Sequence, residues 1–363
     1  MFYHSLISDW NHGNAHFLRG IYASLQGMGH EVLVYEPKDN WSLTCLLKER
    51  GNNALVDFIE NFPNLKTNFY GSDYSELIPE LWEADLVIVH EWTDSSLVTW
   101  LGEQRRRFSY LLFFHDTHHR AVSDPQMMQN MDLSAYDAVL AFGESLKRIY
   151  ELNRWHSNVY TWHEAADTTH YYPMKDIKKV GDVVWIGNWG DDERTEELEE
   201  FLIEPITKLN LKATFYGVRY PEKALKMLKS AGITYGGYLP TSQVSATFSQ
   251  YKATVHVPRR FYSHFLPGIP TIRPFEALAC GIPLLSSPWL DRENLFTIGK
   301  DFMMAQNGKA MTEILNEVIV DQRFAENLSR HGLRTILAKH TCLLRAEQLL
   351  TIYTEVKEEI EAA

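Results

Sequence analysis

Two side chains that can bind a phosphate and a sugar lie three residues apart, at Arg273 and Glu276. Arg273 can neutralise a phosphate, and the Glu276 carboxylate can accept hydrogen bonds from sugar hydroxyls. Pro274 suits a first helical turn, so we expect a helix to begin near it, with Glu276 in the first turn and a stop at Gly281. The N–H groups and positive dipole end of such a turn attract anions. The pattern predicts a site for a phosphorylated sugar; the alternative is an ordinary amphipathic helix that leads into the apolar strand 282–285.

A second group of reactive side chains follows the apolar run 110–114. Three histidines, an aspartate and an arginine occur from His115 to Arg120. If the run is a buried strand, Asp116 or His118 stands at its end, where either could take a proton from a hydroxyl acceptor. Helix capping by Asp116 and an exposed loop are the alternatives. The spacing is irregular for metal ligands, so no metal site is predicted.

A third polar segment, residues 8–14, lies between a predicted strand at 2–7 and a predicted helix at 15–28. Its single glycine, Gly13, does not form a dinucleotide fingerprint. Loops in this position lie at the carboxyl ends of parallel strands, where ligands of doubly wound domains bind. His12 is therefore a candidate base, although a packing histidine is the alternative. On the same grounds the candidates for the acceptor side of a site are Asn11, Gly13, Asn14, His16, His115 and Glu144.

Strand and helix patterns alternate along both halves of the chain, which predicts an α/β protein of two doubly wound, Rossmann-like domains facing a central cleft. The periodicity breaks before Pro173, so we expect a first domain at 1–164, a linker at 165–174, a second domain at 175–340 and a last helix at 341–363. Strands are predicted at 31–35, 66–70, 85–90, 110–114, 137–142, 158–162, 182–187, 212–216, 234–235 and 251–257, and helices at 195–206, 222–231, from 243, 309–320 and 322–338.

The composition limits the classes of function. A chain of 363 residues with 45% hydrophobic content can form two domains, each with its own core. The net charge of −12 disfavours a nucleic-acid partner. Three widely spaced cysteines suit a reducing compartment, and no apolar run approaches the roughly 18 residues of a membrane span. We therefore expect a cytoplasmic protein without a membrane span; the sequence does not indicate its oligomeric state.

A series of motifs along nearly the whole chain carries a family resemblance. The motifs are Trp10-Asn-His-Gly-Asn-Ala-His16, Gly29-His-Glu-Val32, Phe114-His-Asp-Thr117, Tyr136-Asp-Ala-Val-Leu140, Asp167-Thr-Thr-His-Tyr-Tyr-Pro173, Ile186-Gly-Asn188, Tyr238-Leu-Pro240, Arg273-Pro-Phe-Glu-Ala-Leu-Ala-Cys-Gly-Ile-Pro283 and His340-Thr-Cys-Leu-Leu-Arg345. In this order they resemble the CgeB-like family of glycosyltransferases, grouped with family 1 and family 4 type enzymes of GT-B architecture. The run from Phe275 to Pro283 is the most specific of them.

The resemblance implies a hexosyltransferase-type enzyme that moves a sugar from a nucleotide-diphosphate sugar to an acceptor, without a metal or other cofactor, by closure of the cleft. It implies that Glu276 bonds the ribose and that Arg273 and Arg194 neutralise the diphosphate. The other implied donor-binding residues are Gly187, Asn188, Tyr238, Leu239, Pro240, Gly268, Thr271, Ile272 and Phe275. The N-terminal domain would hold the acceptor, and the last helix would pack back on that domain.

One departure from the family pattern concerns the reaction type. Retaining relatives carry Glu-x7-Glu, but the residue eight positions before Glu276 is Gly268. An inverting mechanism would need a base, for which Asp116, His12 and His118 are the candidates; a retaining mechanism of this architecture often uses no protein nucleophile. The alternatives in function are a nucleotide-sugar epimerase or hydrolase on the same fold and a non-catalytic nucleotide-sugar-binding protein.

Overall fold

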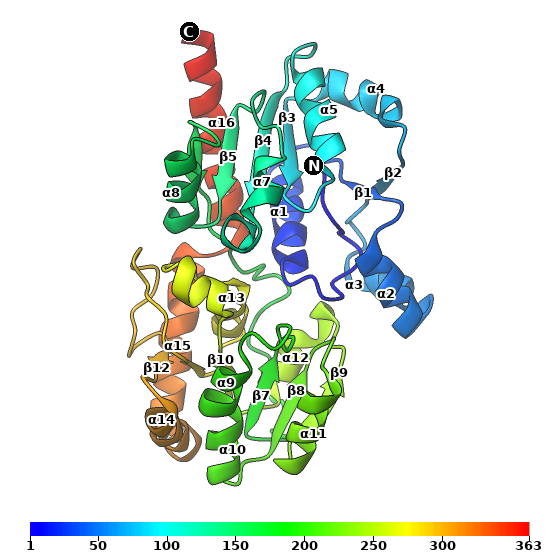
Figure 1. The fold of residues 1–363 in the computed structure, drawn as a ribbon. Coiled ribbons are helices and arrows are strands. Elements are labelled where there is room, and N and C mark those ends of the chain that lie inside the picture. The colour runs from blue at the N-terminus through cyan, green and yellow to red at the C-terminus, as the bar shows by residue number, and fades with distance from the viewer. Residues whose placement is uncertain (363) are drawn as a thin grey trace. The chain divides into compact units, whose positions relative to one another are not determined.

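A computed structural model describes residues 1–362, so that residue 363, the last of the predicted terminal helix, lies outside the described residues. The chain divides into two compact units. Unit 1 contains Met1–Glu164 and the helix that begins at Cys342, and unit 2 is Ala165–Thr341 (Figure 1). Each unit has parallel β-sheet and helices, which confirms the predicted α/β class. The segment predicted as a linker, 165–174, lies in unit 2, where Ala166 forms a β-bridge with Thr341.

The sheet of unit 1 is parallel, and its successive strands are added first on one side of Phe2 and then on the other. Its strands are β1 (Tyr35–Pro37), β2 (Asn68–Tyr70), β3 (Leu86–His90), β4 (Leu111–Asp116), β5 (Ala138–Ala141) and β6 (Val159–Thr161). The strands β3, β4, β5 and β6 lie side by side in that order, and β1 pairs with β2. Phe2 joins the two groups, because it forms parallel bridges to both Tyr35 and Val89. The chain therefore builds the sheet outward in both directions from Phe2, which makes the junction of Phe2 and β3 a topological switch point.

The predicted first strand, 2–7, is wrong in its length, since only Phe2 has bridge pairing among residues 2–7. After Phe2, the buried Glu36 carboxylate binds backbone N–H groups that a neighbouring strand would otherwise pair with. The Glu36 carboxylate accepts hydrogen bonds from the Leu6 N–H at 2.8 Å, the Ile7 N–H at 3.2 Å and the Ser5 hydroxyl at 2.7 Å. Burial raises the pKa of Glu36, and these donors oppose the rise.

The helices of unit 1 include the C-terminal one. They are α1 (Ala15–Gly27), α2 (Trp41–Arg50), α3 (Asn53–Asn61), α4 (Ile78–Glu83), α5 (Ser95–Arg105), α6 (Arg120–Ser123), α7 (Pro125–Gln129), α8 (Glu144–Asn153) and α16 (Cys342–Ala362). Helix α16 packs against α1 (Figure 1). The buried Trp162 indole donates to the Arg345 carbonyl at 2.9 Å, and the Arg345 guanidinium donates to the His163 carbonyl at 3.0 Å. These bonds fix the start of α16 to the chain that follows β6.

Unit 2 has a second parallel sheet with a switch point of its own. Its strands are β7 (Val183–Ile186), β8 (Ala213–Tyr216), β9 (Thr234–Gly237), β10 (Ala253–His256), β11 (Leu284–Ser286) and β12 (Met303–Met304). Their order in the sheet is β12-β11-β10-β7-β8-β9. The chain moves from β7 toward β9 and then returns to start again at β10, beside β7. The carboxyl ends of β7 and β10 are therefore where a ligand of such a sheet binds.

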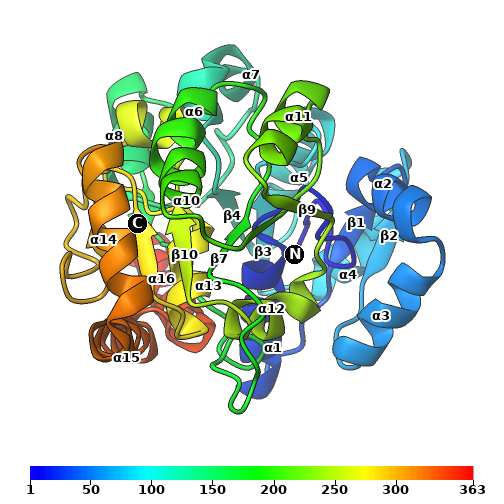
Figure 2. The same cartoon turned by 90° about the horizontal axis from the view of Figure 1, so that it is seen from below.

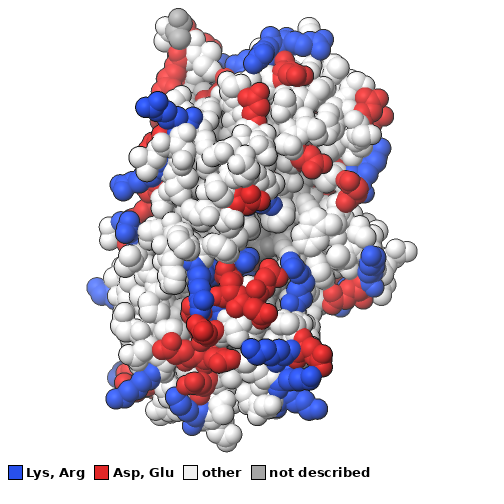
Figure 3. Space-filling model, in the orientation of Figure 1, with Lys and Arg blue, Asp and Glu red and all other residues white. Residues whose placement is uncertain are grey.

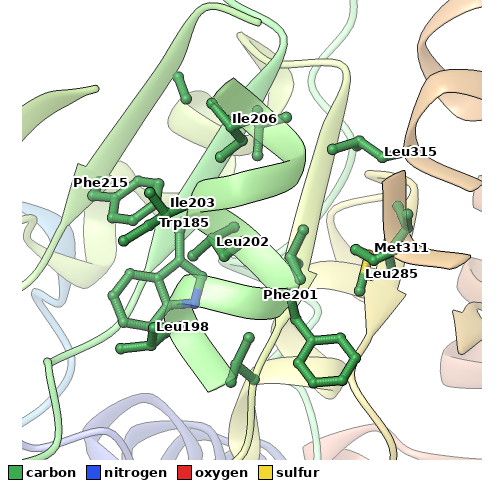
Figure 4. Close-up of a cluster of buried hydrophobic side chains, with 14 of the residues drawn as sticks. Trp185, Leu198, Phe201, Leu202, Ile203, Ile206, Phe215, Leu285, Met311 and Leu315 are labelled. Atoms are coloured by element: carbon green, nitrogen blue, oxygen red, sulfur yellow. The ribbon is translucent and has the colours of Figure 1, made fainter. Parts of the chain in front are cut away.

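Helices cover both faces of the unit 2 sheet. They are α9 (Thr195–Leu198), α10 (Glu204–Lys208), α11 (Glu222–Ser230), α12 (Val244–Ser249), α13 (Ile272–Ala279), α14 (Gly308–Val320) and α15 (Gln322–Lys339). Figure 2 shows α10 and α11 on one side of β7 to β9 and α12 on the other. The core on the α10 side joins Trp185 and Phe215 of the strands to Leu202, Met311 and other buried side chains of the helices (Figure 4).

Two local predictions in unit 2 are corrected. The single helix expected at 195–206 is α9, a π-helical turn at Glu199–Ile203 and α10. Pro205 gives the reason, because it has no N–H to bond the carbonyl four residues earlier and its ring crowds that carbonyl. The segment between the predicted strand 251–257 and the predicted helix near Pro274, for which no helix was predicted, contains a second π-helical turn, Phe261–Phe265. The short strand β12 was not predicted.

Candidate functional site

The loop after β7 is held rigidly at the unit 2 switch point. The Asn188 side-chain oxygen accepts from the Val218 N–H at 2.8 Å, and the Gly187 carbonyl accepts from the Tyr220 hydroxyl at 2.9 Å. Backbone packs closely here, since a Cβ on Gly217 would clash with the Gly187 carbonyl. Gly187 and Asn188, both predicted for the donor site, therefore form a fixed edge of the switch point.

Arg194 connects the two sides of this switch point. Its guanidinium donates to the carbonyls of Asn188, after β7, and Val257, after β10, and at 3.4 Å to that of Trp189. The side chain is 9% exposed, and its charged carbon lies 5.4 Å from the centre of the Trp185 ring. Burial lowers its pKa to about 10, so it stays protonated at neutral pH. The phosphate contact predicted for Arg194 stays a prediction; the structure gives the residue a positioning role.

The helix that carries the predicted phosphate-binding residues begins beside the end of β10. The hydroxyl of Thr271, which precedes α13, lies 3.2 Å from His256 Nε2, and His256 Nδ1 lies 3.0 Å from the Ser286 hydroxyl. Burial, Arg194 and Arg273 lower the pKa of His256 to about 3, so the imidazole is neutral. The start of α13 is thereby fixed at the carboxyl ends of β10 and β11.

Arg273 and Glu276 form an ion pair on α13. Helix α13 begins at Ile272, so Pro274 lies in its first turn as predicted, but Glu276 lies in the second turn and not the first. Glu276 is 2% exposed and Arg273 is 20% exposed. The helix ends as predicted, with Gly281 in the left-handed region at φ +64°. The structure thus holds a buried carboxylate and a half-buried guanidinium beside the switch point.

The remaining residues predicted for the donor site differ in accessibility. Phe275 is buried, 5.5 Å from the Phe296 ring and 5.4 Å from the His340 ring, so it packs in the core. Ile272, Gly268 and Pro240 are buried, while Tyr238 and Leu239 are half-buried after β9. Gly268 has φ +106°, a conformation that disfavours a side chain. A glutamate at that position would therefore be strained.

Charged side chains lie beside one another over unit 2. Arg259 pairs with Glu193 at 3.0 Å, and Arg260 pairs with Glu197 at 2.6 Å and with Glu196 at 2.7 Å. Figure 3 shows acidic and basic groups mixed on this face. Arg259 and Arg260, which form a basic pair in the sequence, are therefore engaged with neighbouring acids.

In unit 1, Thr117 joins the loop 8–14 to the strand ends. Its hydroxyl lies 2.6 Å from the Asn14 side-chain nitrogen, 3.1 Å from His90 Nε2 and 3.3 Å from a Glu91 oxygen. The sequence predicted that the segments around Asn14 and Asp116 face one ligand, and the structure brings them into contact through Thr117. Glu144, by contrast, accepts a hydrogen bond from Thr161 at 2.6 Å beside β6.

The three candidate bases have different surroundings. Both oxygens of Asp116 are engaged, by the Tyr150 hydroxyl at 2.8 Å and the His118 N–H at 3.1 Å, and the side chain is fully buried. Burial and the neighbouring Glu91 raise the pKa of Asp116. His12 is buried, and burial with the nearby histidines holds its pKa well below the ordinary value. His118 is half-buried, with its ring 5.3 Å from that of Trp92.

Other histidines predicted for the acceptor side belong to the core. His115 is fully buried, with ring centres 4.7 Å from Trp162 and 5.4 Å from His90, and burial holds its pKa well below the ordinary value. His16 is 2% exposed within α1. Asn11 is half-buried with φ +51°, and Gly13 is exposed. His115 and His16 are therefore packing residues of unit 1.

Some residues at these strand ends were not among the predicted site residues. His4 and Glu91 follow Phe2 and β3 at the unit 1 switch point, and Trp92 and Thr93 continue from Glu91. His4 has no distinguishing signal in the sequence, because it lies inside the predicted strand 2–7. Glu91 was visible as a polar residue after an apolar run. Burial raises its pKa, and Arg120 opposes the rise.

The two units define the class of the protein. Parallel sheets with helices on their faces, in two successive α/β units with a C-terminal helix, form the GT-B fold. Residues 194–351 match the family model described as glycosyl transferase-like. Among proteins with curated functions, none matches the chain in sequence. The narrower resemblance to the CgeB-like family stays a prediction.

Solved structures match the chain almost end to end. The α-glucosyltransferase AGT, solved with UDP, has a TM-score of 0.68 at 9% identity, over 96% of this chain and 97% of the other. HepE of Anabaena, solved with UDP and glucose, has a TM-score of 0.65 at 12% identity, over 96% of each chain. Sucrose-phosphate synthase of Thermosynechococcus elongatus has a TM-score of 0.63 at 14% identity, over 94% and 93%. At such identities the likeness establishes the shared GT-B fold.

Across residues 1–362, no helix combines the length and the apolar character that crossing a membrane requires. Within the same residues, no three His, Cys, Asp or Glu side chains are placed to hold a metal ion together.

Proposed function

We propose that the protein is a glycosyltransferase that takes a sugar from a UDP-sugar. The observation that carries the proposal is the Arg273–Glu276 pair on α13, beside the switch point of unit 2. A carboxylate suits ribose hydroxyls and a guanidinium suits a diphosphate. The match of residues 194–351 to a glycosyl transferase-like family supports the class of reaction, and the UDP bound to HepE and AGT supports the base.

Each donor-site residue has a proposed role. Arg273 and the positive end of α13 neutralise the leaving diphosphate, which is how a site of this kind works without a metal. Glu276 binds the ribose, and the backbone of Gly187 and Asn188 borders the ligand at the end of β7. Arg194 positions that loop.

For proton transfer we favour His118 among the three candidates. A base must be reachable and basic enough to take a proton near neutral pH. Asp116 has both oxygens engaged, and the lowered pKa of His12 makes it a weak base. His118 is half-buried. Inverting chemistry would use this base; a retaining reaction would not need it.

Calorimetry with UDP tests the donor site directly. Glu276→Ala and Arg273→Ala should each abolish detectable binding. Because either change removes one partner of the ion pair, the double variant Arg273→Leu/Glu276→Leu is included, since replacing both partners of a buried pair is often neutral for stability. Lys252→Ala is the matched control, as Lys252 lies at the amino end of β10 and pairs with Asp182 at 2.8 Å.

The results separate the proposals. Wild-type UDP affinity in the folded double variant would refute the site. Donor binding that persists in EDTA is expected if Arg273 and α13 replace a metal, and loss of binding in EDTA would contradict that role. Isomerisation of the UDP-sugar without an acceptor would favour the epimerase alternative.

A further inference from the structure

Unit 1 contains a pocket at its own switch point. The pocket has a volume of about 390 Å³, and its walls include His4, Trp41, Trp92, Thr93, Arg120 and Met127. His4 follows Phe2, and Trp92 and Thr93 follow β3. The pocket therefore lies at the junction of Phe2 and β3, which is the switch point of this sheet. Ligands of open parallel sheets bind at this place. Its volume lies at the small end of the roughly 300–1,000 Å³ typical of ligand sites.

Three polar groups on the wall of the pocket have unused hydrogen-bonding capacity. Among residues 1–362, His4 Nε2 and the Thr93 hydroxyl have no partner, although these residues are only 6% and 4% exposed. The Arg120 guanidinium makes one hydrogen bond, from Nη1 to the Glu91 carbonyl at 2.8 Å, and within the described chain it has no carboxylate partner within 4.0 Å. Buried polar groups without partners are costly, so His4 Nε2 and the Thr93 hydroxyl, beside the remaining donors of Arg120, indicate that a ligand completes them.

Of the two charged side chains that line the pocket, Asp94 is exposed and Arg120 is buried, so Arg120 is the charge that most needs a partner. The side chain is 8% exposed, and its charged carbon lies 3.6 Å from the centre of the Trp92 ring. Arginine presents five N–H donors in a planar fork that matches a carboxylate or a phosphate. Four of the five remain after the bond to the Glu91 carbonyl, and a buried cation of this kind favours an anionic partner.

Aromatic rings set the shape of the ligand. The rings of Trp41 and Trp92 lie 6.5 Å apart between centres, with an angle of 48° between them, and the His4 ring lies 5.4 Å from the first and 5.6 Å from the second. A ligand with a flat apolar face and polar edges fits such walls, because its face packs on indole while its edge meets Thr93 and His4. A sugar ring has both features.

We infer that this pocket binds the acceptor of the proposed transfer, and that the acceptor is a sugar carrying a carboxylate or phosphate that Arg120 binds. The inference rests on the proposed glycosyltransferase function. The indole wall of Trp41 and Trp92 packs against one face of the ring, and Thr93 and His4 bond its polar edge. The anion distinguishes this acceptor from neutral sugars of the same size.

Calorimetry on the full-length protein, with three probes, tests the inference. The probes are glucose, glucuronate and glucose 6-phosphate, each titrated to millimolar concentration. One of the two anionic sugars should bind at least about tenfold more tightly than glucose, as expected for a charged hydrogen bond, and the preferred one identifies the anion. Equal binding of all three, or none by either anionic sugar, would overturn the inference.

Variants connect the binding to the pocket. Arg120→Met should remove the preference for the anion. Thr93→Val keeps the shape and removes a hydroxyl without a partner, so it should weaken binding of the preferred probe about tenfold while the melting temperature stays equal or rises. Unchanged affinity in Thr93→Val would contradict the inference even if Arg120→Met fails to fold. Trp82→Ala is the control, since Trp82 is 73% exposed and lies outside the pocket walls.

A titration of the wild type with UDP distinguishes failure of the acceptor assignment from failure of the proposed transferase function. If UDP binds and the anionic sugars do not, the acceptor assignment is refuted and the donor site stands. If the anionic sugar binds and UDP does not, the transferase function fails and the acceptor assignment fails with it.

Discussion

Replacing Arg194 with methionine tests whether this residue positions the donor site or binds the donor itself. The guanidinium donates to the carbonyls of Asn188, Trp189 and Val257, which lie on both sides of the unit 2 switch point. Methionine keeps much of the volume and removes all the donors. The loops after β7 and β10 then lose the side chain that connects them.

The expected loss of stability follows from these bonds. Each buried carbonyl left without a donor costs about 1–3 kcal/mol. Removing the guanidinium also removes the cost of burying its charge, which is several kcal/mol and offsets part of the loss. We expect the free energy of unfolding of unit 2 to fall by about 3 kcal/mol, within the range of measured losses on breaking buried polar networks. Arg194→Lys should not restore it, because one ammonium cannot reproduce the planar fork.

Urea unfolding, followed by tryptophan fluorescence, measures the change, and UDP calorimetry on the folded variant measures the site. The control is Arg260→Met, whose ion pairs are exposed to solvent and should contribute little to stability. A positioning role predicts a clear loss of stability with weakened UDP binding. Wild-type stability together with abolished UDP binding would refute the positioning argument and favour direct phosphate contact.

Two further predictions concern the titration of Glu91 in unit 1 and the backbone conformation of Gly281 at the end of α13. Burial raises the pKa of Glu91, so the stability linked to its bound proton is complete below the ordinary carboxyl pKa and is lost as pH rises through the folded value. Urea unfolding of Glu91→Gln should therefore show a growing advantage over wild type from about pH 5 to about pH 8; a constant difference would contradict this. Gly281→Ala should lower the unfolding free energy by about 1–2 kcal/mol, since φ is +64° and a Cβ would lie 3.0 Å from Pro173. Gly299→Ala, with φ +84° and nothing within 4 Å, should lose less in the same assay; an equal loss would show that the Pro173 contact has no effect.

Local patterns predicted the fold well, because parallel α/β sheets are built from short apolar runs between amphipathic helices. Boundaries failed where a side chain replaced a backbone partner. Glu36 bonds the N–H groups of Leu6 and Ile7, so the first strand stops after one bridged residue. Pro205 similarly converts part of one expected helix into a π-helical turn. Neither effect has a signature in hydrophobic periodicity.

The pair proposed for the donor site could be predicted from sequence because Arg273 and Glu276 are neighbours on one helix. The unit 1 pocket could not, since His4, Trp41, Trp92 and Arg120 come from four separate segments. Their common feature, hydrogen-bonding capacity left unused after folding, is a property of tertiary structure. The same limit affected the histidines, because His115 and His118 look equivalent in sequence and only one is buried in the core.

Arg120 and Arg194 show how the tertiary structure decides the role of an arginine. Both are nearly buried beside a tryptophan ring, and each lies near the switch point of its sheet. Arg194 gives its donors to three backbone carbonyls, so the protein itself compensates the desolvated charge. Arg120 bonds one carbonyl and interacts with the Glu91 carboxyl and the Trp92 ring, so most of its N–H donors remain for a ligand. Loss of Arg194 should therefore be seen first in unfolding, and loss of Arg120 first in ligand selectivity. The number of donors that remain after folding distinguishes a positioning arginine from a binding one.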